Sequence, residues 1–111
     1  MSEVVVVGSF KAEPGKEAEA FEAFQALVEP THAEDGCILY ALHQGSDDPS
    51  RLAFVERWES SEHLDAHMAT EHLRALTARM PELLSEAPDI VAYLPLPAGD
   101  PAKGTLAGQA G

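Results

Sequence analysis

The order of strand-like and helix-like segments constrains the fold of this chain more than any other sequence feature. Four segments are strongly β-prone or alternate with a period of two, which is typical of strands. They cover Val4 to Phe10, Cys37 to Gln44, Leu52 to Glu59 and Asp89 to Leu94. Two segments repeat apolar residues at helical spacing, over roughly Lys16 to Ala33 and from near Ser61 towards Leu84. The order β-α-β-β-α-β predicts an α+β ferredoxin-like sandwich, a four-stranded antiparallel sheet with both helices on one face.

The second helical segment carries signals for an interruption. Ser60 or Ser61 supplies an N-cap oxygen at its start, and Thr70 followed by Glu71 has the pattern of a second N-cap. Pro81 would bend the last turns or restart them. We therefore expect a break at Thr70, which would uncouple the helical phase of the residues before it from that of the residues after it.

Two of the predicted strands carry apolar residues on both faces. These are Val4 to Val7 and Cys37 to Leu42. Two helices can cover only one face of a sheet, so an isolated domain would expose a large apolar surface to water. We expect an obligate homodimer in which a second copy packs sheet against sheet.

The chain has 111 residues, enough for one domain, which we place at residues 1–94. From Pro95 onward the sequence is rich in Pro, Gly and Ala and has few residues that could anchor it. This composition predicts a disordered C-terminal tail over residues 95–111.

Charge and composition exclude several classes of partner. The net charge of −12 argues against nucleic acid and against an anionic membrane surface, since both need a basic patch. No apolar run approaches the roughly 18 residues that cross a bilayer, and the N-terminus lacks the pattern of a signal peptide. We expect a cytoplasmic location.

Cys37 is the only cysteine, so no intrachain disulfide can form, and it is interpreted as a small buried hydrophobe.

A candidate pocket is encoded where the third strand meets the second helical segment. The stretch from Val55 to Leu73 contains the only tryptophan and three of the five histidines. Phe54, Glu56 and Trp58 share one strand face, so a Glu56 that faces the helices would be buried and would need a partner such as an imidazole. This layout predicts a pocket with an apolar wall and a titratable rim.

The three histidines differ in their predicted surroundings. His63 and His67 are four residues apart, a spacing that can place two imidazoles on one metal. On an ideal helix both lie away from the apolar stripe, which favours a solvated face, so no metal site is expected. His72 falls near the middle of the stripe, either as a core residue or as a pocket residue facing the sheet. With a break at Thr70, His67 could also turn inward.

Short motifs spread over most of the chain match one known family. In chain order they are Pro14-Gly15 before a helix, Gly36-Cys37-x-x-Tyr40 opening a strand, Glu56-x-Trp58-Glu59-Ser60, Ala66-His67 and Thr70-x-His72. In these motifs the chain resembles the antibiotic biosynthesis monooxygenase family, and in particular its quinol monooxygenase members. The resemblance runs from about Val4 to Leu94. It implies a ferredoxin-like domain that assembles as a dimeric α/β barrel.

The same resemblance implies a reaction class. It points to a cofactor-independent monooxygenase that oxidises a small aromatic substrate, a quinol or polycyclic phenol, with O₂. His67 or His72 would remove a phenolic proton, and the phenolate would reduce O₂ directly. The substrate-binding residues would hold the flat ring and exclude water; they are Trp58, Tyr40, Phe54 and Glu56. The sequence has no Gly-rich phosphate loop and no Cys-x-x-Cys, so no nucleotide or flavin cofactor is expected.

Two other functions remain open at this point. Similar autoinducer-2-processing proteins isomerise a small phosphorylated metabolite, and such a substrate needs anchors such as Arg57, Arg74, Arg79 and Lys11. A non-catalytic ligand-binding dimer would instead have a pocket packed shut by its own side chains. Haem-degrading members of the wider family use an asparagine, a tryptophan and a histidine. This chain contains no asparagine, so the resemblance does not extend to haem.

Overall fold

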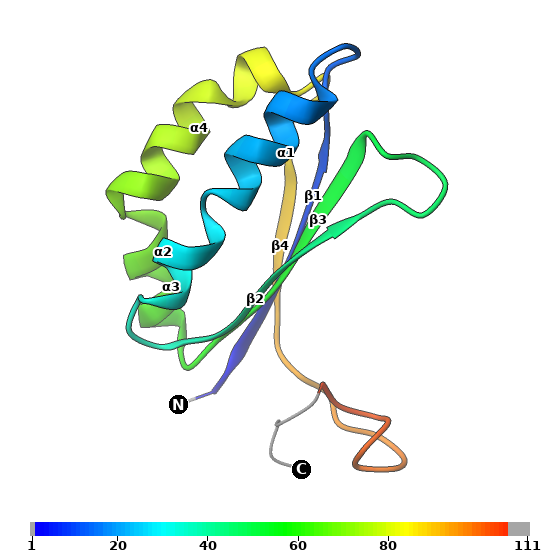
Figure 1. Ribbon diagram of the computed structural model, residues 1–111. Coiled ribbons are helices and arrows are strands. Elements are labelled where there is room, and N and C mark those ends of the chain that lie inside the picture. The colour runs from blue at the N-terminus through cyan, green and yellow to red at the C-terminus, as the bar shows by residue number, and fades with distance from the viewer. Residues whose placement is uncertain (1, 107–111) are drawn as a thin grey trace.

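The predicted strands pair into one antiparallel sheet. In the computed structural model, which describes residues 2–106, they are β1 (Val4–Lys11), β2 (Cys37–Gln44), β3 (Arg51–Trp58) and β4 (Asp89–Tyr93). The strand order is β2-β3-β1-β4, and all three neighbouring pairs are antiparallel. The helices lie together on one face of the sheet (Figure 1). The α+β ferredoxin-like sandwich is therefore confirmed.

Four helical segments cover this inner face. They are α1 (Glu17–Gln25), α2 (Val28–His32), α3 (Ser61–Met68) and α4 (Glu71–Leu83). The expectation of a single helix from Lys16 to Ala33 is wrong, because the chain breaks between α1 and α2. Pro30 explains the break, since it has no N–H to offer the carbonyl of Ala26 and its ring crowds that oxygen. Pro81 has no such effect, and α4 continues through it.

The break at Thr70 is confirmed, and a hydroxyl group organises it. Thr70 is the N-cap of α4 and accepts a hydrogen bond from the N–H of Leu73 at 3.4 Å. The same hydroxyl donates to the carbonyl of His67 at 2.8 Å. Ser60 is the N-cap of α3. The two helices are thus fixed relative to each other at the point where the histidines lie.

The core lies between the helices and the inner face, and aromatic rings dominate it. Phe10 and Phe24 meet edge to face with centroids 4.7 Å apart, and Tyr40 stacks on Phe54 at 4.3 Å. All four side chains are buried. Packed aromatic pairs of this kind stabilise a core beyond the area that they bury.

A β-bulge interrupts the strict alternation of side chains near the start of β2. The pairing of β2 with β3 shifts register between Cys37 and Leu39. Ile38 consequently points away from the inner face and is 43% exposed. Strict alternation along β2 would place Ile38 on the same face as Tyr40, but the bulge turns it away, and Cys37 packs against the core instead.

The outer face of the sheet is apolar, as predicted. Val5 and Val7 are half-buried there, next to exposed Val91 and Tyr93 on β4. Residues 95–106 form bends and turns beyond one end of the sheet (Figure 1), and their predicted disorder stays a prediction. The remainder of the predicted tail, residues 107–111, lies outside the described residues. Within residues 2–106, no helix has the length and apolar character to cross a membrane.

Candidate functional site

A cavity of about 320 Å³ lies between the inner face of the sheet and helices α3 and α4. Its wall is mainly apolar and includes Val6, Tyr40, Phe54, Leu76 and Met80. Besides the hydroxyl of Tyr40, the polar groups among its lining residues belong to Glu56, Asp65, His67 and Thr77. A mainly apolar cavity with a few polar groups is the usual form of a small-molecule site, and roughly 300–1,000 Å³ is its usual size.

His67 is the histidine that reaches this cavity. Its ring is 2% exposed and packs on Trp58 with centroids 4.6 Å apart. The solvated face favoured by an ideal helical wheel is therefore wrong for His67. Since α3 ends at Met68, its phase is independent of the next helix, and the inward alternative is confirmed. Trp58 is fully buried behind His67 and is not among the residues that line the cavity.

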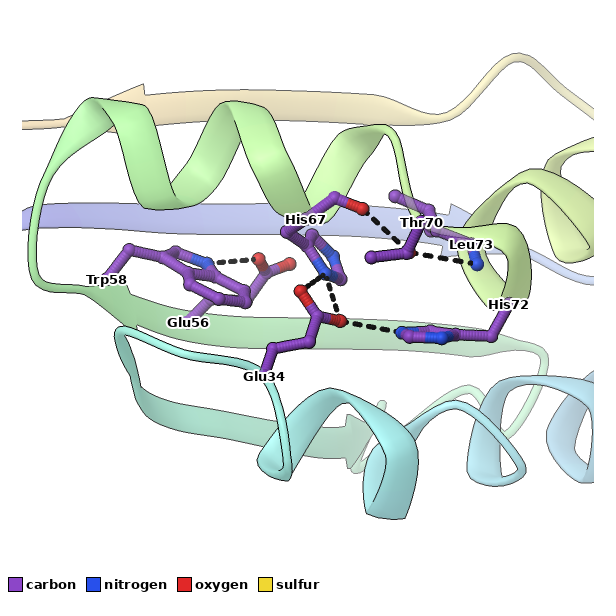
Figure 2. A network of polar contacts seen from close by, with 7 residues as sticks. All are labelled: Glu34, Glu56, Trp58, His67, Thr70, His72 and Leu73. Atoms are coloured by element: carbon purple, nitrogen blue, oxygen red, sulfur yellow. Dashed lines mark hydrogen bonds and ion pairs between the residues drawn. The ribbon is translucent and has the colours of Figure 1, made fainter.

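Glu34 orients His67 from the turn that precedes β2. The Nδ1 atom of His67 lies 3.1 Å and 2.9 Å from the two carboxylate oxygens (Figure 2). A carboxylate can only accept hydrogen bonds, so Nδ1 carries the proton. Burial lowers the pKa of His67 although the contact with Glu34 opposes this, so the ring is neutral at pH 7. The neutral ring then keeps a basic lone pair on Nε2.

His72 contacts the same carboxylate. Its Nε2 lies 2.6 Å from Oε2 of Glu34, and Figure 2 shows both imidazoles in contact with this carboxylate. The His72 side chain is 28% exposed and is not among the cavity-lining residues. Its predicted position in the middle of the apolar stripe is wrong. Because α4 starts afresh at Glu71, the inward positions go to Leu73 and Leu76.

Glu56 is the second titratable group of the cavity. It is buried on the inner face and accepts a hydrogen bond from the indole N–H of Trp58 at 3.0 Å. Its partner is thus an indole and not the imidazole that the sequence suggested. Burial raises the pKa of Glu56 to about 7, the Trp58 hydrogen bond opposes this rise, and Glu34 adds to it. A carboxyl group with such a pKa can gain or lose a proton near neutral pH.

The remaining candidate residues take supporting positions. Tyr40 and Phe54 line the cavity as a stacked pair, and burial raises the pKa of Tyr40, so its hydroxyl stays protonated. Burial also raises the pKa of the Cys37 thiol to about 11, which leaves it a poor nucleophile. His63 lies outside the cavity, with its ring against the Ser60 hydroxyl at 2.7 Å.

Sequence reasoning missed Glu34, Asp65 and Thr77. Glu34 lies in a turn that reads as ordinary solvated charge, and its partner His67 is 33 positions further along the chain. Asp65 is exposed at the rim of the cavity. The hydroxyl of Thr77 donates to the carbonyl of Leu73 within α4. Apart from residue type, the sequence contains no signal for any of the three, because their positions relative to the cavity depend on how α3 and α4 are joined.

The basic residues considered as phosphate anchors do not reach the cavity. No arginine or lysine occurs among the described residues that line it. Arg57 alternates to the outer side of β3, where its guanidinium group binds Glu3 at 2.7 Å. Arg79 pairs with Glu19 and Glu82 on the helical surface. The cavity is therefore poorly suited to a phosphorylated ligand.

Comparison with known proteins gives a consistent family. The family model described as "Antibiotic biosynthesis monooxygenase" matches residues 3–79. The Mycobacterium tuberculosis protein Rv0793, provisionally named a monooxygenase, is 32% identical over 95 residues, which are 86% of this chain and 93% of that protein. YgiN of Escherichia coli, named a probable quinol monooxygenase, is 28% identical over 82 residues, 65% of this chain and 79% of YgiN.

Solved structures agree with the sequence matches. The structure of Rv0793 superposes with a TM-score of 0.83 at 30% identity and covers 89% of this chain and all of that one.

A further sequence relative is matched over only part of its length. The Synechocystis protein sll1783 is 30% identical over 90 residues, 81% of this chain. The matched region spans only 61% of the length of sll1783.

Proposed function

Because the chain belongs to the antibiotic biosynthesis monooxygenase family, we propose that it oxidises a quinol or polycyclic phenol with O₂. The observation that supports this most directly is the cavity itself. An apolar space of about 320 Å³ receives a buried imidazole whose Nδ1 is held by a carboxylate. An open cavity of this kind is also what distinguishes a catalytic site from one that is packed shut by its own side chains.

His67 is the general base in this proposal. Nε2 removes the phenolic proton, and the imidazolium that forms is stabilised by Glu34 at 2.9 Å. This is the role that a buried carboxylate plays beside a catalytic histidine in hydrolases. The aromatic wall formed by Tyr40 and Phe54 positions the substrate ring, and Trp58 supports His67 from behind. Water exclusion by these side chains strengthens the electrostatic interactions of the site.

The oxidation itself needs no group beyond the phenolate and O₂. The phenolate transfers an electron to O₂, and the resulting radical pair combines to form a carbon–oxygen bond at a ring C–H position. The hydroperoxide then loses water and leaves a carbonyl oxygen on the ring. One oxygen atom of O₂ enters the product and the other leaves as water, while the substrate loses two hydrogens.

Glu56 has a separate role in this scheme. One of its oxygens accepts from Trp58, and the other is left for a substrate hydroxyl group. With a pKa of about 7, the carboxyl can supply the proton that the departing peroxide oxygen needs. His72 touches Glu34 rather than the cavity, so we assign it as a positioning residue. Its loss should shift the pH dependence of turnover and not merely lower the rate.

Oxygen uptake with a panel of quinols tests the proposal. Substitution His67→Gln should lower the rate by about 10²–10⁴-fold, the usual contribution of a general base. The matched control is His63→Gln, which alters a histidine on the same helix that lies outside the cavity. Equal rates in the wild type and His67→Gln would remove His67 from the mechanism. Anaerobic turnover of a phosphorylated sugar would favour the isomerase instead.

We further propose that the protein works as a homodimer formed through the outer face of the sheet. The support is the apolar surface made by Val5, Val7, Val91 and Tyr93, of which Tyr93 is 51% exposed. Light scattering should give about twice the chain mass of 11.9 kDa. Tyr93→Asp should give monomers, since a charge buried between two sheets is costly. A monomeric wild type would contradict this part of the proposal.

A further inference from the structure

Three side chains from three different segments converge beside the cavity. Glu34 comes from the turn before β2, His67 from the end of α3 and His72 from the start of α4. One possible ligand atom from each lies within 4.8 Å of the other two. Two histidines and one glutamate are a ligand set that zinc enzymes use, with a fourth position left open. We propose that Glu34, His67 and His72 bind a divalent transition-metal ion of the zinc type.

Binding of a metal ion would require only small changes in the distances between these ligand atoms. Oε2 of Glu34 lies 2.9 Å from Nδ1 of His67 and 2.6 Å from Nε2 of His72. Ligands at roughly 2.1 Å from a tetrahedral ion are about 3.4 Å apart, so these contacts must open by about 0.5–0.8 Å. The nitrogen–nitrogen separation must close from at most 4.8 Å. His72 can make most of this movement, because its side chain is 28% exposed at the first turn of α4.

The same exposure provides a route for the ion. Glu34 is 13% exposed and His72 is 28% exposed, while His67 is buried at 2%. An ion therefore arrives from the His72 side without passing through the apolar cavity. The open fourth position would face solvent on that side and take a water molecule.

The break between α3 and α4 creates this set of ligands. Residues five apart on a continuous α-helix point about 140° away from each other, so His67 and His72 could not share an ion. The hydroxyl of Thr70 bonds to the carbonyl of His67 and to the N–H of Leu73, which fixes the junction that brings both rings to Glu34 (Figure 2). The sequence expectation of no metal site considered only His63 and His67. In the structure His63 turns instead towards Asp35, 3.6 Å away.

A metal ion bound at this site would change the chemistry of His67. This consequence rests on the proposed function, in which His67 is the base. The ion would bind Nδ1 and displace its proton. The neutral ring would then carry its proton on Nε2, the nitrogen that serves as the base towards the cavity. Metal binding would therefore convert His67 from a proton acceptor into a hydrogen-bond donor and inhibit turnover.

Metal binding can be measured without any substrate. The full-length protein is stripped with a chelator and titrated with Co²⁺ and Zn²⁺ near pH 7.5. We expect one ion per chain, with the visible d–d absorption of four-coordinate Co²⁺, and tighter binding as pH rises because the ion replaces protons. Zinc should displace the cobalt and remove the absorption. Absence of saturable binding at one ion per chain would overturn the proposal.

Variants distinguish this site from one that would be formed by His63 and His67 on a single helix. His72→Ala and Glu34→Gln should each weaken binding by more than about 100-fold, since loss of outer-shell partners alone costs 10–100-fold. His63→Ala is the matched control and should bind as tightly as the wild type. If His63→Ala loses binding while His72→Ala keeps it, the ion is held by His63 and His67 and the proposed site is wrong.

The effect on His67 has a readout that is independent of activity. In protein labelled with ¹⁵N-histidine, the proton of His67 should lie on Nδ1 without metal and move to Nε2 when zinc is bound. If zinc binds at the site but the tautomer does not change, the inhibitory consequence is wrong. A metal-free protein that binds zinc as expected but oxidises no quinol would instead count against the proposed monooxygenase alone, so the two ideas fail separately.

Discussion

Replacing Glu56 by glutamine should stabilise the protein at alkaline pH. Glu56 is buried beside Trp58, and burial raises its pKa from 4.5 to about 7. The unfolded chain therefore releases this proton near pH 4.5, whereas the folded protein holds it until about pH 7. Below pH 4.5 the carboxyl is protonated in both the folded and the unfolded chain, so it costs the fold nothing. As pH rises from 4.5 to about 7, the unfolded chain ionises first and the free energy of unfolding falls. Glutamine keeps an oxygen that accepts from the indole but cannot ionise.

The size of the effect follows from the shift. Each pKa unit corresponds to 1.36 kcal/mol, so a shift from 4.5 to about 7 gives an upper value of about 3 kcal/mol above pH 7. Relaxation around the charge and partial hydration should reduce this to about 1–3 kcal/mol. Against a total stability of about 5–15 kcal/mol for a domain, such a change is readily measured.

Urea unfolding at pH 5 and pH 8 provides the assay. The free energy of unfolding of Glu56→Gln relative to the wild type should increase by about 1–3 kcal/mol between the two pH values. Glu59→Gln is the matched control, because Glu59 is exposed just beyond the same strand and should give no pH-dependent difference. An identical pH profile for Glu56→Gln and the wild type would refute the assignment of a raised pKa to this carboxyl.

Two further substitutions examine the same network. Glu34→Ala leaves the buried Nδ1 proton of His67 without its acceptor and should cost about 1–3 kcal/mol of unfolding free energy, measured by thermal melting. The neighbouring Asp35→Ala should leave the melting temperature unchanged, because its side chain is 98% exposed. Trp58→Phe removes the N–H that lowers the pKa of Glu56, so NMR titration should show that pKa rising above about 7; a fall would contradict the hydrogen bond.

The strands were predictable because their signal is local. Alternation placed Phe54, Glu56 and Trp58 on one strand face, and the N-cap pattern placed the break at Thr70. Prediction failed where one residue changes the geometry without changing the apolar pattern. Pro30 divided a segment that still reads as one amphipathic helix, and the bulge at Ile38 shifted a register that alternation alone cannot show.

The site was predictable in composition but not in arrangement. Trp58, Glu56 and His67 were identified because polar groups beside a lone tryptophan stand out in the sequence. The partners were assigned wrongly, since Glu56 pairs with the indole and Glu34 pairs with the imidazoles. Long-range pairing of this kind depends on which helix faces meet the sheet, and local spacing does not contain that information.

The amino-acid order alone therefore determined the α+β class, which β3 residues share a strand face, and the helix break, because each follows from periodicity or capping within a few residues. Only the tertiary structure decided that His67 enters the cavity while His72 stays at its edge. That division arises from the break between α3 and α4, where the Thr70 hydroxyl contacts both helices. The tertiary structure also decided that the carboxylate of Glu34, from a distant turn, contacts the rings of both His67 and His72. The proposed base and the proposed metal site both depend on this contact.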